Sequence, residues 1–384
     1  MKSSYYCLFF AFIFACNGSN EKTNHDLQGF EITSDTVIVD PGQEILFLTW
    51  KLGLSTLSQD KKYLYNFNNQ DFAIEQINLN TLKFEKKYPF EKEGPNGVGE
   101  YLMGFSLIDN DQIFFSTFTG KGIFDWQGNK LESFNLANMG EEKGLMEETD
   151  RAYKILSFSS EGKKFASLIT NYRSKTNALA IIDRENQTFE KHAIPAVDRA
   201  SDFEIFLNDG KSAIGFGAYR FLVQEGGNII LGTNVSNELY VVNQKSNSLQ
   251  LLSYNSDLTP NQKSGTYPAE TSDMDEFKSY RQKIQEDINF REPYWDEKKQ
   301  VYYRISYHTK FDENPAISEG GMFPSPSSVE AYLSILDKDL NLIKEGEFPQ
   351  LNRVPEFHFA KDGKLWLFEN IEDEMGFVRF DISW

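Results

Sequence analysis

The sequence has few of the residues that build metal centres, disulfide frameworks and membrane spans. Its 384 residues include two cysteines and four histidines, too few cysteines for a multi-cysteine metal site or a disulfide framework. No stretch approaches the 18 consecutive apolar residues of a membrane-spanning helix. Lysine and arginine number 39 against 57 acidic residues, which gives a formal net charge of −18. Because phosphate binding needs clustered positive charge, we expect no nucleic-acid partner.

The N-terminus has the pattern of a bacterial lipoprotein signal. Lys2 precedes the apolar run Tyr5–Phe14, which is too short to span a membrane and suits a signal peptide. The run ends in Ile-Phe-Ala-Cys, which resembles a lipobox with Cys16 as the lipidated residue. We expect residues 1–15 to be a signal peptide and residues 16–29 a flexible tether. An ordinary secretory signal with a chance cysteine is the alternative.

Lipidation of Cys16 would place the protein in the cell envelope, on a bacterial membrane. The lipid alone would hold it there, since anionic headgroups repel an acidic protein. The 33 Phe, 18 Tyr and 5 Trp supply the bulky apolar area of a folded domain and argue against disorder.

A four-stranded unit recurs along the chain. Short runs of Phe, Tyr, Ile, Leu and Val alternate with polar turns, as in β-hairpins. The first turn of each unit is marked by Asp60, Asp111, Gly162, Gly227, Lys298 and Gly363, which lie 51 to 71 residues apart. The third strand of each unit ends in Asx, at Asn80, Asp125, Asp183, Asn243, Asp337 and Asp381. Two independent markers that agree on six units predict an all-β, six-bladed β-propeller of four-stranded blades.

The two ends of the chain complete this architecture. The last unit stops at Trp384 after its third strand, and the alternating segment Phe30–Val39 precedes the first unit. We expect this N-terminal strand to complete the last blade and close the ring, which removes an exposed sheet edge. Residues 30–384 would then be one propeller domain. A two-domain β-sandwich protein is the alternative.

These features resemble a known family. The lipobox, the six units, EGPNGVGEY (Glu93–Tyr101) and PYWDEKKQVYYRI (Pro293–Ile305) are similar to uncharacterised TolB-like six-bladed propeller lipoproteins of Bacteroidota. The resemblance implies the fold and covers nearly the whole chain. It implies no established reaction and no site residues.

One face of the propeller carries the long loops. Because strands alternate in direction, loops between blades and loops between second and third strands emerge on the same side. The long segments all belong to it: 93–103, 137–152, 195–219, 256–290 and 308–328. We call this side the long-loop face and expect binding there. Within it, Ser272–Asp287 has helical periodicity with Ser272 and Asp275 as a capping box, and would either form a lid or only pack over a gap between blades.

No catalytic or metal-binding motif stands out. DKDLN (Asp337–Asn341) lacks the glycine and glutamate of a calcium loop and is better explained as a hairpin turn. Candidate ligand-binding residues border the long-loop face or the innermost strands, where arginine can bind carboxylates: Arg173, Arg220, Arg291, Tyr294, Trp295, Arg304, His308, Arg353 and His358. Ion pairing between blades, or packing between them, is the competing interpretation.

Two classes of function fit the sequence. The favoured hypothesis is a non-enzymatic, monomeric envelope protein that binds a protein or small ligand through the long-loop face, without a cofactor. The alternative is a propeller hydrolase or lactonase with a calcium ion in the channel, held by Asp, Asn and Glu oxygens.

Overall fold

The computed structural model describes residues 29–384, except 109–110, 118–119, 135, 137–144, 158–161, 209, 211–212, 244–247, 314–316 and 318–321. The predicted signal peptide, the tether up to residue 28 and Cys16 lie outside this range. In the part of the chain that is described, no helix is long and apolar enough to cross a membrane. Strands dominate, so the protein is all-β.

Six sheets follow one another along the chain, and each is antiparallel. Sheet 1 contains β2 (Ser55–Leu57), β3 (Tyr63–Asn68), β4 (Ala73–Asn78) and β5 (Lys83–Pro89). Sheet 2 contains β6 (Leu102–Leu107), β7 (Gln112–Thr117), β8 (Lys121–Asp125) and β9 (Lys130–Ser133). Sheet 3 contains β10 (Asp150–Ser157), β11 (Lys164–Asn171), β12 (Thr176–Asp183) and β13 (Thr188–Ala193).

The remaining three sheets differ in how they are completed. Sheet 4 contains β16 (Arg220–Glu225), β17 (Asn228–Thr233), β18 (Leu239–Asn243) and β19 (Leu249–Leu252). Sheet 5 contains β21 (Asn289–Phe290), β22 (Tyr294–Asp296), β23 (Val301–Lys310), β24 (Ser328–Leu336) and β25 (Leu342–Glu347). Sheet 6 contains β26 (His358–Lys361), β27 (Lys364–Ile371), β28 (Glu374–Ser383) and the N-terminal strand β1 (Glu31–Ile38).

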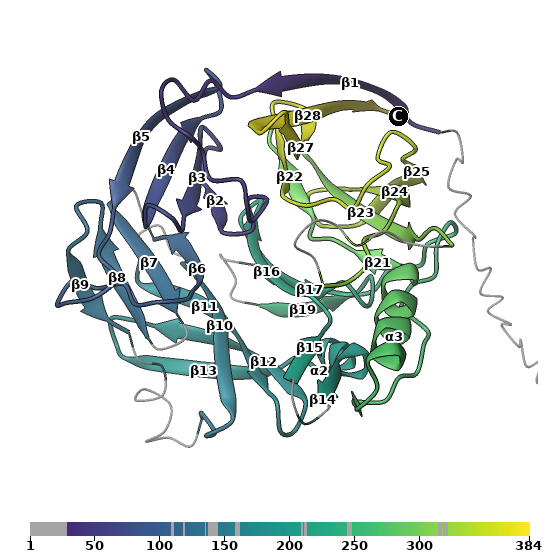
Figure 1. Cartoon of the computed structure of the whole chain (residues 1–384), viewed down its shortest axis with the longest axis horizontal. Helices are drawn as coiled ribbons and strands as arrows, with labels where there is room; N and C mark the ends of the chain where they lie inside the picture. Colours follow the sequence, from purple (N-terminus) through teal and green to yellow (C-terminus); the bar gives the residue numbers. More distant parts are fainter. Residues whose placement is uncertain are drawn as a thin grey trace, which may run out of the picture.

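The first strands of the sheets lie toward the centre of the molecule. In Figure 1, β2, β6, β10, β16 and β22 surround the middle, whereas β5, β9 and β13 lie on the outside. Contacts link β2 to β6, β6 to β10, β10 to β16 and β22 to β26. The innermost strands therefore meet their neighbours around a common centre.

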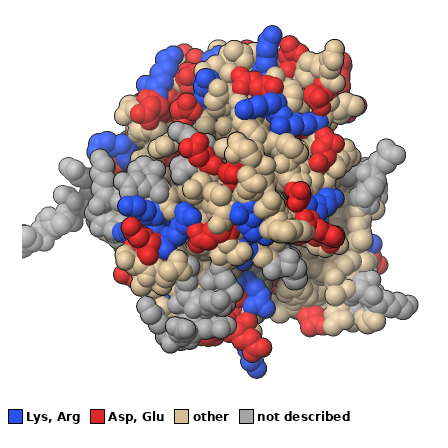
Figure 2. All heavy atoms as spheres, turned by 90° about the vertical axis from the view of Figure 1, so that its left-hand side faces the viewer, with Lys and Arg blue, Asp and Glu red and all other residues tan. Residues whose placement is uncertain are grey.

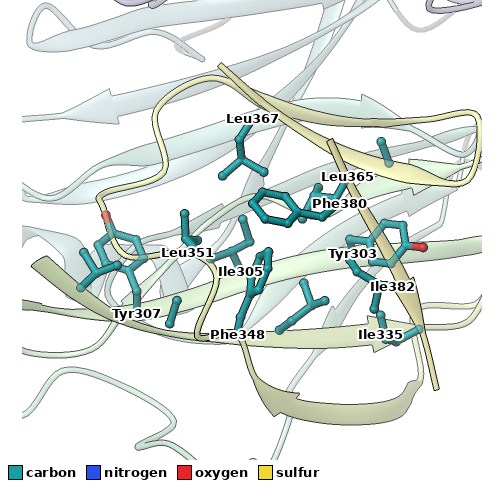
Figure 3. Packing of buried hydrophobic residues seen from close by; sticks show 14 of the residues in the cluster. Tyr303, Ile305, Tyr307, Ile335, Phe348, Leu351, Leu365, Leu367, Phe380 and Ile382 are labelled. Atoms are coloured by element: carbon teal, nitrogen blue, oxygen red, sulfur yellow. The ribbon is translucent and has the colours of Figure 1, made fainter. Parts of the chain in front are cut away.

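Six hydrophobic clusters each join two successive sheets, and one of them joins sheet 6 to sheet 1. Figure 3 shows the cluster between sheets 5 and 6, where Phe348 and Phe380 pack edge to face at 4.9 Å. Middle strands such as β4 and β17 are buried throughout, because each of their faces packs against a different neighbouring sheet. The abundant aromatic residues therefore fill the spaces between sheets.

The two ends of the chain pair with each other. β1 runs antiparallel to β28 from Glu31 opposite Ser383 to Ile38 opposite Gly376. The Asp35 carboxylate accepts hydrogen bonds from Lys364 (2.9 Å) and Arg379 Nε (3.0 Å), which tie β1 to β27 and β28. The edge of β28 is thereby covered by the N-terminal strand.

The Asx markers of the repeat act as hairpin-turn residues, with two differences from the prediction. The Asp125 carboxylate accepts from the backbone of Gln127 and Asn129, and Asp337 does the same for Asp339 and Asn341. In the first unit, however, the turn is made by Asn78 and not by Asn80, whose N–H it accepts. Asp381 lies inside β28 and pairs with Lys364, because the chain there meets β1 and does not turn.

Two of the long segments fold into an accessory layer. It contains α2 (Pro195–Asp198), the 3-10 helix η1 (Arg199–Phe203), β14 (Ile205–Asn208), β15 (Ala213–Phe216), β20 (Glu270–Thr271) and α3 (Met274–Glu286). β14 pairs with β15 and, in parallel, with β20. These elements bury Phe203, Ile205, Phe277 and Ile284 in a cluster of their own, and lie together at the lower right of Figure 1.

The predicted helix is confirmed, but its cap lies one residue later than Ser272. Asp273 is the N-cap of α3, and its carboxylate accepts from the N–H groups of Asp275 (2.8 Å) and Glu276 (2.9 Å). Aspartate satisfies these otherwise unpaired donors and favours the positive end of the helix dipole. Because Phe277 and Ile284 are buried, α3 packs against the molecule through the face that the periodicity predicts.

Acidic and basic side chains alternate over the flank seen in Figure 2. Lys87 lies 2.7 Å from Glu44 and 2.5 Å from Asp71, and Arg184 lies 2.6 Å from Glu132. The excess negative charge is therefore interspersed with positive charge on this side of the molecule.

Candidate functional site

The innermost strand of sheet 5 is interrupted at three residues, and two of them carry charge. β21 and β22 both pair with β23 but are separated by Arg291, Glu292 and Pro293. Proline has no N–H to give to the ladder, so the strand breaks there. The Arg291 N–H still donates to the carbonyl of Ile305 at 2.9 Å, which fixes the position of the break. Arg291 and Glu292 therefore leave the strand at its long-loop end.

Six side chains meet at this break, and we call them the central cluster: Tyr219, Arg291, Glu292, Tyr294, Tyr307 and His358. Arg291 Nη2 donates to Glu292 Oε1 (3.4 Å), and Tyr294 donates to the same oxygen (3.2 Å). The Arg291 guanidinium lies over the Tyr219 ring at 5.2 Å, and Tyr294 packs edge to face on His358 at 4.8 Å.

The cluster draws on three sheets. Tyr219 precedes β16, Arg291 to Tyr294 belong to the break and to β22, and His358 begins β26. Tyr307 comes from β23 and lies at one end of the hydrophobic cluster in Figure 3, with its hydroxyl group pointing away from that cluster. Tyr307 is near the end of the second strand of its sheet and the other positions are at or near the start of an innermost strand, so the central cluster faces the long-loop side.

Three buried polar atoms of the cluster lack hydrogen-bond partners among the described residues: Arg291 Nε, Glu292 Oε2 and His358 Nε2. Glu292 is 4% exposed and His358 is 1% exposed. Glu292 Oε2 lies 3.3 Å from Arg291 Nε, but without hydrogen-bond geometry, and His358 Nε2 also has no partner. Leaving such atoms unpaired costs about 1–3 kcal/mol each. The central cluster therefore has unsatisfied hydrogen-bonding capacity.

The charges of the cluster support one another. Burial would raise the pKa of Glu292, but the positive charge of Arg291, followed by smaller effects of His358 and Lys154, lowers it. Burial would lower the pKa of Arg291, but the Glu292 carboxylate raises it. Glu292 is therefore a carboxylate and Arg291 a guanidinium at neutral pH.

His358 is neutral, and its contact with the Glu356 carbonyl favours one tautomer. Burial, followed by the charge of Arg291, lowers the pKa of His358 to about 4. Nδ1 lies 3.2 Å from the carbonyl oxygen of Glu356. Since a carbonyl only accepts, Nδ1 carries the proton, and Nε2 is an acceptor.

Tyr219 and Lys154 show that water reaches the cluster. Tyr219 exposes 41% of its surface. The surrounding protein nevertheless desolvates its phenol group, and this desolvation, followed by the charge of Glu292, raises the pKa of Tyr219. Lys154, on the innermost strand β10 of sheet 3, is also exposed, and desolvation lowers the pKa of its ammonium while Glu292 raises it. Both side chains are therefore reached by solvent, although the surrounding protein desolvates their polar groups.

The opposite side of the centre is crossed by an ion pair. Lys61, in the turn between β2 and β3, donates to Glu225 Oε2 (2.8 Å) and to the carbonyl of Trp295 (2.7 Å). Glu225 ends β16 of sheet 4, so the contact joins sheet 1 to sheets 4 and 5. Both side chains are largely buried, at 17% and 9% exposed. The centre is therefore bridged on the side away from the long loops.

Of the residues predicted from sequence, Arg291, Tyr294 and His358 come together in the central cluster. Arg220 instead pairs with Glu204 at 2.5 Å, and Arg353 pairs with Glu369. Arg173 lies exposed in the loop between β11 and β12. Arg220 and Arg353 are therefore engaged in ion pairs, but neither pair joins two of the six sheets as the competing interpretation expects.

The other three predicted residues have mainly structural contacts. Trp295 is 9% exposed and packs on Tyr302 at 4.8 Å between sheets 4 and 5. Arg304 is buried, and its guanidinium donates to the carbonyls of Arg291 (3.1 Å) and Asn237 (2.5 Å). His308 Nδ1 lies 3.1 Å from the carbonyl of Glu286 in α3.

Two hollows formed by described residues lie outside the central cluster. One, of about 310 Å³, lies beside η1 and includes Arg199 and Lys263. Arg199 donates to Gln262, and the Lys263 ammonium donates to the Ile284 carbonyl (2.7 Å) and Asn289 (2.9 Å). The other, of about 30 Å³ beside Arg304, has room for about one water molecule.

Metal-binding groups are scarce in the described ranges. Within them, no three His, Cys, Asp or Glu side chains converge as a metal site. In DKDLN, the Asp337 carboxylate is used by the backbone of its own turn, as the hairpin interpretation predicts.

Sequence reasoning missed Glu292 and Lys154. Glu292 stands between two predicted residues, Arg291 and Tyr294. The sequence feature that could have revealed Glu292 is the charged pair Arg291–Glu292, which directly precedes a proline at the start of an innermost strand. Lys154 is placed by a β-bulge: Ala152 pairs with Ile169 and Ile155 with Ser167, so two residues of β10 oppose Leu168. A bulge of this kind redirects side chains and has no clear sequence signature.

Comparison with known proteins identifies the family. A crystal structure of a DUF4221 family member from Bacteroides vulgatus has 15% sequence identity and a TM-score of 0.65, over 93% of this chain and 99% of that one. This likeness shows a shared fold. A protein from Bacteroides fragilis described as exported has 12% identity and a TM-score of 0.49, over 92% and 96% of the two chains.

Weaker similarity extends to other proteins. The β-propeller domain of Cps50 (Swd1) from Myceliophthora thermophila has 9% identity and a TM-score of 0.36, over 91% and 98% of the chains. Among curated proteins, none matches the sequence significantly. The sequence model of the domain of unknown function DUF4221 matches residues 28–347. This chain therefore belongs to the DUF4221 family.

Proposed function

We propose that the protein is an exported, lipid-anchored β-propeller that binds a small polar ligand at the central cluster, from the long-loop face. Residues 1–15 would be the signal peptide, Cys16 the lipid anchor, residues 16–29 the tether and residues 30–384 the propeller. The ligand-binding role is non-enzymatic and needs no cofactor.

The six sheets support six blades in a closed ring. Each of the six hydrophobic clusters joins two successive sheets, including sheets 6 and 1. The pairing of β1 with β28 supplies the fourth strand of sheet 6. In this arrangement the innermost strands line a central channel, and the central cluster lies at its long-loop end.

One observation carries the ligand-binding proposal: unpaired, buried polar atoms lie beside an exposed tyrosine at the centre. Glu292 Oε2 and His358 Nε2 lack partners among the described residues, and both accept hydrogen bonds. Tyr219 exposes 41% of its surface next to them. A ligand with hydrogen-bond donors would satisfy both acceptors and cover the aromatic ring.

Thermal denaturation with a library of small polar compounds tests the proposal. A ligand that binds only the folded state at a hundred times its Kd stabilises it by about 2.7 kcal/mol. We expect at least one compound to raise the Tm of the wild type but not that of Tyr219→Ala. The matched control is Tyr101→Ala, which removes a tyrosine that is 77% exposed and precedes β6. If every stabilising compound acts equally on Tyr219→Ala, the central cluster is not the binding site.

The anchor has its own test. Cys16→Ser removes the thiol that would carry the lipid, and we expect the protein to leave the membrane fraction after cell lysis. Cys7→Ser is the matched control, because Cys7 would be discarded with the signal peptide. Persistent membrane association of Cys16→Ser would rule out lipidation at this residue.

A protein partner is the second candidate, supported by exposed apolar side chains on long-loop segments. Ile45 is 88%, Tyr101 77% and Met322 60% exposed. Ile45→Asp combined with Tyr101→Asp should abolish co-purification of a partner from envelope extracts and leave small-ligand stabilisation unchanged. Equal recovery of the partner with this variant would dismiss a role for these side chains.

The calcium-dependent hydrolase has less support from the donor atoms present. The buried carboxylate of the cluster is Glu292, and its neighbours are the nitrogen atoms of Arg291 and His358. Calcium takes six to eight oxygen ligands, and the guanidinium of Arg291 would repel it. A rise in Tm with calcium that a chelator reverses would restore this alternative.

A further inference from the structure

Three basic side chains stand on the long-loop side of sheets 2 and 3 without an acidic partner in the described part of the chain. Lys121 begins β8, and Arg151 and Lys154 lie on β10. Among the described residues, none of the three forms an ion pair. The Arg151 guanidinium donates only to the backbone carbonyls of Glu148 (2.7 Å) and Asp150 (2.8 Å). In a chain with 57 acidic residues, unpaired cations in one place are unusual.

Two of these cations, Lys121 and Arg151, are close enough to affect one another. The charge of Arg151 adds to burial in lowering the pKa of Lys121. Arg151 and Lys154 stand three positions apart on one strand, which is about 10 Å. Both are exposed on the innermost strand of sheet 3, whose contacts with β6 and β16 place it at the centre. A negatively charged group bound beside Lys121 and Arg151 would relieve the repulsion between these two cations.

Lys154 connects these cations with the central cluster. Its ammonium senses the charge of Glu292, although no ion pair between them is formed. The bulge in β10 gives the strand an additional residue opposite Leu168, which turns the strand locally. Lys154 therefore brings positive charge within electrostatic reach of Glu292, whose Oε2 is a hydrogen-bond acceptor of the central cluster together with His358 Nε2.

We infer that the ligand is a small hydroxylated carboxylate, with its carboxylate at Lys154 and hydroxyl groups that donate to Glu292 and His358. This inference rests on the proposed function of the central cluster. Lysine supplies a point charge for the carboxylate, and charge-assisted hydrogen bonds are the stronger kind. Hydroxyl groups both donate to the two acceptors and tolerate the neighbouring Tyr219 phenol. A ligand with only a carboxylate would leave the acceptors of Glu292 and His358 unsatisfied, and a ligand with only hydroxyl groups would leave Lys154 without an anion.

Isothermal titration with three classes of probe tests the inference. The first class combines charge and hydroxyl groups: glucuronate, gluconate, tartrate and citrate. The second, glucose and glycerol, has hydroxyl groups alone, and the third, acetate and sulfate, has charge alone. Sodium chloride keeps the ionic strength equal, so that general screening does not differ between probes. We expect at least one member of the first class to bind at least about tenfold more tightly than both other classes.

Variants locate the binding. Lys154→Ala should weaken the Kd of that probe about tenfold and bring it near the Kd of glucose. Lys338→Ala is the matched control, since Lys338 lies in the exposed turn between β24 and β25, and should leave the Kd unchanged. Glu292→Gln keeps the size of the side chain and should weaken the hydroxylated probes without affecting acetate.

The outcomes separate the two proposals. If neutral compounds bind as tightly as the carboxylates, or if Lys154→Ala binds as wild type does, the inference is wrong and the proposed function stands. If no compound of any class stabilises the wild type more than Tyr219→Ala, the proposed function itself fails. Equal loss of binding in Lys338→Ala would show an effect of overall charge and would also overturn the inference.

Discussion

At the residue scale, the central cluster shows which functional side chains a sequence reveals. Arg291, Tyr294 and His358 were predicted because they border an innermost strand or a long loop. Glu292 was not, since its burial depends on a strand break that only the pairing of β21 and β22 with β23 defines. Lys154 was missed because nothing in its neighbours marks the bulge that places it. Contacts between sheets 3, 5 and 6 decide these positions, and such contacts leave no local pattern.

The buried imidazole of His358 makes stability depend on pH. Its pKa falls from the ordinary value of 6.5 to about 4 on folding, so the unfolded state binds more protons between these values. The contribution is fully present above about pH 6.5 and is lost as the pH falls toward 4, in total about 3 kcal/mol. Urea unfolding at pH 7 and pH 4.5 should show a smaller loss of unfolding free energy in His358→Gln than in wild type.

His192→Gln is the matched control for this measurement. His192 lies on the outer strand β13 with its side chain 40% exposed, and its replacement should leave the pH dependence as in wild type. An unchanged pH dependence in His358→Gln would mean that this imidazole is not held in its neutral form by the folded protein.

At the element scale, the residue types at the turns predicted the structure better than the lengths of the loops did. Asx residues such as Asp125 and Asp337 use their carboxylates for the following backbone N–H groups, a local interaction that the sequence shows directly. The segments 195–219 and 256–290 were expected to be long loops, with a helix in the second. They also form β14, β15 and β20, whose parallel pairing joins residues about 60 positions apart and therefore lies beyond any local pattern. The helix α3 was predictable because its apolar periodicity and cap are both local.

The N-terminal strand β1 tests the closure of sheet 6. Deleting residues 29–38 would expose the edge of β28 and remove the Asp35 contacts with Lys364 and Arg379. We expect a lower Tm and, because an open edge pairs with other chains, self-association detected by light scattering.

Deleting residues 17–28 is the control for the β1 deletion, since it shortens only the predicted tether. That variant should unfold at the wild-type temperature and remain monomeric. If loss of β1 leaves both the Tm and the molar mass unchanged, β1 does not contribute to the closure of the ring.

At the scale of the whole molecule, the overall charge disfavours long anionic partners, whereas the positive charge near the centre favours a small anion. The formal net charge of −18 argues against polyanionic partners, yet it is spread over a surface where acidic and basic groups alternate, as on the flank in Figure 2. On the innermost strand of sheet 3, Arg151 and Lys154 lack acidic partners among the described residues, while Arg291 is matched by Glu292. A small anion can therefore bind at the centre of an acidic protein, whereas a long polyanion would meet its negative surface.

A crystal structure of the protein with the hydroxylated carboxylate that binds most tightly tests this account most directly. The account predicts ligand density at the long-loop end of the centre, with the carboxylate beside Lys154 and hydroxyl groups within about 3 Å of Glu292 Oε2 and His358 Nε2. Density for that compound in the hollow beside η1 or on the outer flank, with the central cluster unchanged from the unliganded protein, would contradict it.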